Sequence, residues 1–353
     1  MINIENLLRE NIKKLVPYSS ARDEFKGTAD VYLDANENSY GSPLTENFNR
    51  YPDPLQLEVK EKISRIKGVP AENIFLGNGS DEAIDILFRA FCNPGIDNVI
   101  VCPPTYGMYE VSANINDVFV KKIPLTQKFQ LDLEAISEVA DENTKLIFIC
   151  SPNNPTGNSV DREDIEIILN NFSGIVVIDE AYINYSRQRS FISELTEYPN
   201  LVVLQTLSKA WGLAGLRLGM AFASEKIIYI FNKIKPPYNI NSSTQRIVLD
   251  ALENIEQVNA WTKETIAERE KLSAALKNLS CVLEIFPSDA NFLLVKVTDP
   301  ISIYNRLVEK GIIVRDRSKV TLCEGCLRIT VGTPEQNQIL ITALQNFNSQ
   351  NKN

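Results

Sequence analysis

Lys209 stands in a stretch whose residue types suit covalent chemistry on a carbonyl group. It follows the apolar run 200–205, so we expect it just beyond the end of a buried strand. Small and apolar neighbours remove part of its hydration, which favours the neutral amine that attacks carbonyl carbons. Thr206, Ser208 and Arg217 supply donors for an anion such as a phosphate. The stretch therefore suits Schiff-base chemistry on a phosphorylated aldehyde, although an ordinary strand–loop connection has a similar pattern.

Two further loops carry candidate residues. Asp179 ends the apolar run 174–179, and a carboxylate at the end of a buried strand requires a partner. That partner could be a helix N-terminus, a lysine, or the protonated nitrogen of a pyridine ring, which Asp179 would keep cationic. Tyr182, three residues on, could then donate to the phenolic oxygen of the same ring. Asn154 lies in the proline-bracketed loop 151–157, a composition that also builds simple turns.

A glycine turn precedes the helix predicted from residue 80. Gly79 is followed by Ser80 and Asp81, and backbone N–H groups at a helix start form an anion cradle. An ordinary helix cap would have the same sequence.

The elements that must position these residues alternate between strand and helix. Apolar β-type runs occur at 98–102, 117–123, 145–150, 174–179, 200–205 and 218–223. Several are apolar almost throughout, which is typical of strands covered on both faces, and the alternation predicts an α/β fold with a mostly parallel sheet. Ligands of such sheets bind at the carboxyl ends of strands. Asn154, Asp179 and Lys209 each follow one of these runs.

A second, smaller α+β domain is expected beyond residue 240. One long amphipathic helix is predicted over 244–279, followed by short strands at 292–297, 311–315 and 326–331. The predicted division is a large domain over 35–240 and a small domain formed by 1–34 together with 241–353.

The composition narrows the classes of function. The chain has 353 residues, with 36 basic and 45 acidic side chains and a formal charge of −9, which argues against nucleic acid or an anionic membrane as partner. Because no signal peptide or membrane-spanning run is visible, we expect a cytoplasmic protein. The absence of histidine excludes imidazole catalysis. The six cysteines are expected to be reduced, and the Cys323–Cys326 pair lacks the further ligands of a metal site.

Three motifs in this order and spacing resemble the fold-type I pyridoxal-phosphate aminotransferases. They are Asn-Pro-Thr-Gly at 154–157, Asp-x-x-Tyr at 179–182, and Ser-Lys at 208–209 with arginine eight residues on. The stretches at 33–38, 51–53, 79–82, 207–210 and 326–332 resemble the histidinol-phosphate aminotransferase branch, so the likeness spans nearly the whole chain. Trp211 and Ser39 depart from that branch, which commonly has Phe and Pro there.

The resemblance implies a role for each candidate. Pyridoxal 5′-phosphate would be the cofactor, with Lys209 bonded to its aldehyde carbon and later moving the substrate proton. Asp179 would pair with the pyridine nitrogen, Tyr182 and Asn154 would hold the phenolic oxygen, and Tyr106 would stack on the ring. The groups implied for the cofactor phosphate are Ser80, Asp81, Thr206, Ser208 and Arg217, together with Tyr51 from the other subunit of a homodimer.

Substrate binding is implied for Arg328, Arg315, Tyr18 and Asn154. Arg328 lies in an apolar run, where an unpaired guanidinium is costly. By resemblance, the two arginines bind a substrate phosphate in one half-reaction and the α-carboxylate of glutamate in the other, because both anions accept the same forked donor.

The expected reaction converts L-histidinol phosphate and 2-oxoglutarate to imidazole-acetol phosphate and L-glutamate, a step of L-histidine biosynthesis. An aromatic amino acid aminotransferase and a pyridoxal-phosphate decarboxylase of a phosphorylated amino acid are alternatives with related motifs. A cofactor-responsive regulatory module without catalysis is a third alternative. The chain has no room for the DNA-binding domain that such a module usually carries.

Overall fold

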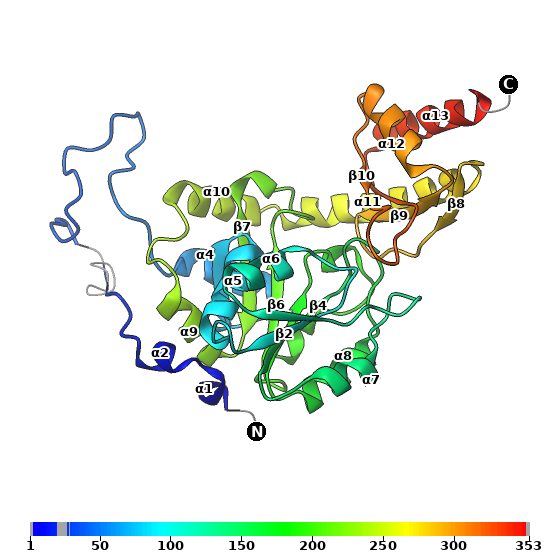
Figure 1. The fold of residues 1–353 in the computed structure, drawn as a ribbon. Helices are drawn as coiled ribbons and strands as arrows, with labels where there is room; N and C mark the ends of the chain where they lie inside the picture. Colours follow the sequence, from blue (N-terminus) through cyan, green and yellow to red (C-terminus); the bar gives the residue numbers. More distant parts are fainter. Residues whose placement is uncertain (1–2, 20–26, 28, 351–353) are drawn as a thin grey trace.

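The computed structural model describes residues 3–19, 27 and 29–350, with side chains up to residue 345. Two β-sheets organise these residues, and Figure 1 shows the smaller one beside the red C-terminal helix. The larger sheet has seven strands in the order β1-β7-β6-β5-β4-β2-β3. Its strands are β1 (Ile74–Asn78), β2 (Asn98–Val101), β3 (Phe119–Lys122), β4 (Thr144–Cys150), β5 (Ile175–Asp179), β6 (Leu201–Thr206) and β7 (Leu218–Ala223).

The large sheet is mostly parallel, as the alternation of apolar runs predicts. Strands β2 to β6 run parallel, whereas β7 pairs antiparallel with both β6 and β1. Successive side chains of β4 enter different apolar clusters, Phe148 on one face and Ile147 on the other, so both faces are covered. The covering helices are α4 (Leu57–Lys67), α5 (Ser80–Phe91), α6 (Met108–Ile115), α7 (Leu133–Val139), α8 (Arg162–Asn171) and α9 (Glu225–Ile234).

Short 3-10 segments connect these elements. They are η1 (Ala71–Asn73), η2 (Ile183–Tyr185), η3 (Phe191–Glu194) and η4 (Ala214–Leu216).

The smaller sheet is antiparallel, with strand order β10-β11-β9-β8. Its strands are β8 (Val282–Ile285), β9 (Phe292–Val297), β10 (Arg315–Asp316) and β11 (Cys326–Thr330). It packs with α11 (Ile255–Lys277), α12 (Pro300–Glu309) and α13 (Pro334–Gln350). The sequence does not predict β8, and of the strand expected over 311–315 only Arg315 is in a strand.

The single long helix expected over 244–279 is wrong. The structure has α10 (Ser242–Leu252) and α11, separated at Glu253 and Asn254. We call the seven-stranded sheet with its covering helices the large-sheet unit, and the four-stranded sheet with α11, α12 and α13 the small unit. Helix α10 packs against α4 of the large-sheet unit, whereas α11 leads into the small unit. Val248 of α10 and Val258 of α11 pack in the same apolar cluster, whereas Leu272 farther along α11 packs in the cluster of the small sheet.

The beginning of the chain packs on the large-sheet unit. Helices α1 (Ile4–Leu7) and α2 (Glu10–Lys14) bury Ile4 and Ile12 in the cluster formed by α5 and α9. The Lys233 ammonium donates to the Ile12 carbonyl oxygen at 2.8 Å. This placement differs from the expectation that residues 1–34 join the small domain. Of that segment, residues 1–2, 20–26 and 28 lie outside the described part. Residues 29–50 form an arm that extends from the body (Figure 1).

None of the helices in the described part of the chain is both long enough and apolar enough to cross a membrane.

Candidate active site

A cavity of about 740 Å³ lies at the carboxyl ends of β4, β5 and β6, where β10 and β11 of the small sheet face the large one. It is lined by most of the residues that the sequence predicts for the site. These are Ser80, Asp81, Tyr106, Asn154, Asp179, Tyr182, Thr206, Ser208, Lys209, Arg217, Arg315 and Arg328. Strands that are neighbours in the sheet bring these residues together from distant parts of the sequence.

Lys209 follows β6 and is open to the cavity. Its Nζ lies 5.5 Å from the centre of the Tyr182 ring. The partial burial of the ammonium lowers its pKa, the positive charges of Arg328 and Arg217 lower it further, and Asp179 opposes this shift. A larger fraction of Lys209 is therefore neutral near pH 7 than for an ordinary lysine, as its sequence context predicts.

Asp179, at the end of β5, is only 3% exposed. The Tyr109 hydroxyl donates to its Oδ2 at 2.7 Å, and the Ala181 N–H donates to its Oδ1 at 3.1 Å. Burial raises the pKa of Asp179, while these two donors and Lys209 act in the opposite direction. The carboxylate is thus held in one orientation by fixed donors.

Tyr109 is a site residue that the sequence analysis missed. It is fully buried in α6, and burial raises the pKa of its hydroxyl, which remains a neutral donor. Its ring lies edge-on to Tyr106, with 5.6 Å between ring centres. Tyr106 lies just before α6 and Tyr109 lies in its first turn, and the spacing of three residues from Tyr106 is the signal that could have identified Tyr109.

The turn before α5 forms an anion cradle. Gly79 has φ +74°, and its N–H donates to the Arg217 carbonyl oxygen at 2.7 Å. A Cβ on Gly219 of β7 would lie 2.1 Å from the Ser80 nitrogen, so glycine is required there for β7 to approach the helix start. The first N–H groups of a helix have no partner inside it. Arg217 adds a positive charge at this turn, since its Nη2 lies 3.7 Å from Asp81 Oδ2. The turn can therefore hold a phosphate.

Thr206, Ser208 and Tyr106 border the same cradle. The Thr206 hydroxyl accepts from the Ser208 N–H at 3.0 Å, which shapes the loop that follows β6. The Tyr106 hydroxyl donates to Asp81 Oδ1 at 3.1 Å, so the aromatic ring is tied to the start of α5.

Asn154 joins the two sheets. Its Nδ2 donates to the Tyr182 hydroxyl at 3.4 Å, and its Oδ1 accepts from Arg328 Nη1. The Arg328 guanidinium also lies 5.2 Å from the centre of the Phe292 ring. The small sheet thus supplies a positive charge to a cavity that is also lined by residues at the strand ends of the large sheet.

Three arginines of the small unit line the cavity. Arg315 and Arg328 are register partners in β10 and β11, and Arg317 lies two residues beyond Arg315. Among the residues that the structure describes, none of the three forms an ion pair with a carboxylate. Burial and the neighbouring guanidinium groups lower the pKa of Arg317 and Arg328. Arg317 was missed, although a spacing of two residues from Arg315 could have indicated it.

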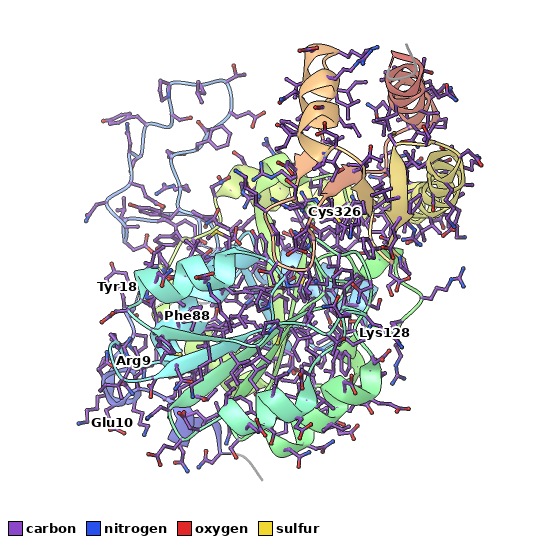
Figure 2. All side chains as sticks on the ribbon, turned by 45° about the vertical axis from the view of Figure 1, so that its right-hand side comes forward. Arg9, Glu10, Tyr18, Phe88, Lys128 and Cys326 are labelled. Atoms are coloured by element: carbon purple, nitrogen blue, oxygen red, sulfur yellow. The ribbon has the colours of Figure 1, made fainter. Side chains whose placement is uncertain are left out.

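Tyr18 and Tyr51 do not line this cavity. Tyr18 is 75% exposed, and Figure 2 shows it at the edge of the molecule, apart from Cys326 of β11. Tyr51 is half exposed and stacks on Tyr238, with ring centres 4.4 Å apart. Tyr18 is therefore not brought to the site of its own chain, and Tyr51 was expected at the site of a second chain.

Comparisons with known proteins agree with this geometry. The model of the family described as aminotransferase class I and II matches residues 24–344. Histidinol-phosphate aminotransferases of Cytophaga hutchinsonii and Parabacteroides distasonis are 54% and 55% identical to this chain, and each alignment covers 98% of this chain and 99% of the relative. The structure of histidinol-phosphate aminotransferase from Sinorhizobium meliloti in complex with pyridoxal 5′-phosphate superposes with a TM-score of 0.77 at 23% identity. That superposition covers 88% of this chain and 89% of the other.

Proposed function

This chain belongs to the class I and II aminotransferase family, and from that premise we propose that it is a histidinol-phosphate aminotransferase. The reaction is the transfer of the amino group of L-histidinol phosphate to 2-oxoglutarate, which forms imidazole-acetol phosphate and L-glutamate in histidine biosynthesis. The cofactor is pyridoxal 5′-phosphate.

The cavity has a complementary group for each part of this cofactor. The cradle at the start of α5, where a Cβ on Gly79 would lie 2.7 Å from Arg217 Nη2, suits the phosphate. Asp179, with its two fixed donors, suits the protonated ring nitrogen, and the partly neutral amine of Lys209 suits the aldehyde carbon. When bound, pyridoxal 5′-phosphate supplies an electron sink that stabilises negative charge on the substrate carbon.

The protein side chains then have separate tasks. Lys209 would be the base that takes the proton from the substrate carbon and delivers it to the carbon of the cofactor's aldehyde group, which its lowered pKa favours near neutral pH. Asp179 keeps the ring nitrogen protonated, while Asn154 and Tyr182, already in contact, orient the phenolic oxygen.

The arginine cluster is the observation that carries the choice of substrate. Arg315, Arg317 and Arg328 bring three positive charges into one cavity wall, without an ion-paired carboxylate in the described part of the chain. Such a wall favours a doubly charged phosphate over a neutral aromatic side chain. The same forked donors bind a carboxylate, so glutamate and 2-oxoglutarate can use this wall in the second half-reaction.

A homodimer with Tyr51 contributed across the interface is part of this proposal. The arm holds its own shape, since Arg50 pairs with Glu37 at 2.6 Å and the Tyr51 N–H donates to Glu37 Oε1 at 2.7 Å. It nevertheless presents large apolar side chains to solvent, and a second copy of the chain would cover them. These side chains are Val31, Leu33, Tyr40, Leu44 and Phe48. A cytoplasmic location, as the sequence predicts, belongs to the same proposal.

The half-reaction tests the activity and the substrate together. Protein with bound cofactor is mixed with L-histidinol phosphate or with phenylalanine, and the absorbance of the bound cofactor is followed. Conversion by histidinol phosphate alone is expected. Conversion by phenylalanine alone would indicate an aromatic amino acid aminotransferase. Release of carbon dioxide would indicate a decarboxylase. Lys209→Ala should abolish conversion, whereas Lys226→Ala, at an exposed position of α9, should not.

Subunit mixing tests the role of Tyr51. The Tyr51→Ala and Lys209→Ala variants are each expected to be impaired alone. If Tyr51 acts on the partner's site, a mixed dimer has one site with both residues intact, and activity returns on mixing. If activity does not return in mixed dimers that are shown to form, Tyr51 does not act across the interface.

A further inference from the structure

Glu180 is a buried carboxylate that the proposed reaction does not use. It follows Asp179 directly and is only 2% exposed. Its Oε1 accepts from the Phe191 N–H at 2.7 Å, and its Oε2 accepts from Gln205 Nε2 at 2.9 Å and from the Ser190 hydroxyl. Every one of these partners is a donor, which suits an ionised carboxylate at this place.

The contact with Gln205 joins the ends of two neighbouring strands. The Glu180 N–H donates to the Leu204 carbonyl oxygen at 2.8 Å, and the side-chain bond from Gln205 lies beside this backbone contact. Gln205 precedes Thr206 and the loop with Lys209. The buried Oε1 of Gln205 has no partner among the described residues, so this amide interacts with the protein through its Nε2 donor.

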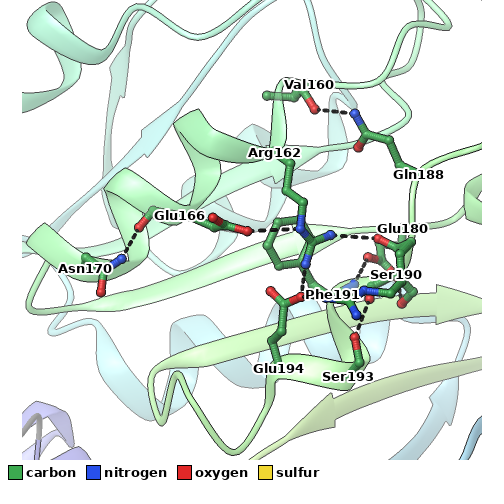
Figure 3. Close-up of polar contacts among 11 residues, drawn as sticks. Val160, Arg162, Glu166, Asn170, Glu180, Gln188, Ser190, Phe191, Ser193 and Glu194 are labelled. Carbon is green, nitrogen blue, oxygen red and sulfur yellow. Dashed lines mark hydrogen bonds and ion pairs between the residues drawn. The ribbon is translucent and has the colours of Figure 1, made fainter.

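An outer layer of ion pairs holds the segment that supplies Ser190 and Phe191 (Figure 3). Arg162 contacts Glu166 at 3.0 Å and also pairs with Glu194 of η3. Its guanidinium lies 3.9 Å from the centre of the Phe191 ring. The donors of Glu180 are therefore fixed from outside, and the carboxylate cannot shift without breaking several contacts.

We propose that Glu180 is a positioning residue that sets the separation between Asp179 on β5 and the phosphate-binding groups that follow β6. This inference rests on the proposed function, because it requires a cofactor held at both ends. The ring of pyridoxal 5′-phosphate is rigid, so its nitrogen and its phosphate can be held together only if the two strand ends keep one spacing.

Two substitutions remove this link from opposite sides. Glu180→Gln places an amide N–H₂ where donors converge, and Gln205→Met removes the donor while keeping an unbranched chain of similar length. Each variant is expected to bind pyridoxal 5′-phosphate about tenfold more weakly as apoenzyme, the usual effect of losing a hydrogen bond to a charged group. The double variant should lose little more than either single variant, since both remove the same contact.

Glu268→Gln is the matched control. It makes the same chemical change on another buried carboxylate, which contacts Lys271 and Asn337 rather than β5 or β6. It should lower the melting temperature of the apoenzyme and leave the affinity for pyridoxal 5′-phosphate unchanged. Inorganic phosphate occupies only one end of the site, so its binding, followed by the rise in melting temperature, should be equal in all variants.

The possible outcomes separate the inference from the proposed function. If the parent protein binds pyridoxal 5′-phosphate and the folded variants bind it within about twofold as well, Glu180 does not position the site and the inference is wrong, whereas the proposed function stands. Equal weakening of phosphate and cofactor would indicate general damage and would also refute the inference. If the parent fails to bind the cofactor, the proposed function fails first. Should Glu180→Gln not fold, Gln205→Met decides the question.

Discussion

Replacement of Tyr109 by Phe removes one hydroxyl from behind the cofactor site and should change the ionisation of Asp179. The Tyr109 hydroxyl donates to the buried carboxylate at 2.7 Å. A hydrogen bond to a charged group contributes about 1.5–3 kcal/mol, which corresponds to roughly one to two pKa units. The hydroxyl stabilises the ionised form, so its loss raises the pKa of Asp179. Since burial already raises this pKa, the variant should lose its carboxylate charge at a higher pH than the parent.

The affinity of the apoenzyme for pyridoxal 5′-phosphate across pH measures this effect. Affinity falls in acid as Asp179 becomes protonated, and in Tyr109→Phe the fall should begin about one pH unit higher. Tyr185→Phe is the matched control, because Tyr185 is also buried but contacts Asn291 rather than Asp179. If both variants have the same pH profile as the parent, the hydroxyl does not support the charge of Asp179.

Three further results are expected from the same structure. Arg328→Ala should raise the KM for L-histidinol phosphate and for glutamate together, and an effect on only one of them would contradict a shared anion site. Arg328→Met removes a positive charge that lowers the pKa of Lys209, so the pH at which the apoenzyme reacts with pyridoxal 5′-phosphate should move up; an unchanged rate profile would exclude this coupling. Burial and the charge of Lys235 lower the pKa of Lys60 to about 8 from 10.5. The unfolded chain therefore binds more protons between these values, and the stability of the parent rises with pH there. In chemical denaturation at pH 7, Lys60→Met should be more stable by about 3 kcal/mol, and the gain should shrink above pH 8; a gain that is independent of pH would refute the electrostatic cause.

The sequence by itself determined the large unit and the residues that follow its strands. The apolar runs expected at 174–179 and 218–223 correspond closely to β5 (Ile175–Asp179) and β7 (Leu218–Ala223). Strands buried on both faces leave no polar alternation, so their extent can be recognised locally. The positions of Asn154, Asp179 and Lys209 in one cavity follow from the parallel order of those strands, because parallel strands end at the same edge.

Only the tertiary structure decided which other side chains complete the site. Tyr109 has the pattern of an ordinary core residue, and its partner Asp179 is 70 positions away. Arg317 lines the cavity together with Arg315 and Arg328 because β10 pairs with β11 in the small sheet. The division of 244–279 into α10 and α11 and the packing of Ile12 beside α9 likewise depend on long-range burial. Local periodicity records that a face is apolar, but the surface that covers it is chosen by contacts between segments far apart in the chain.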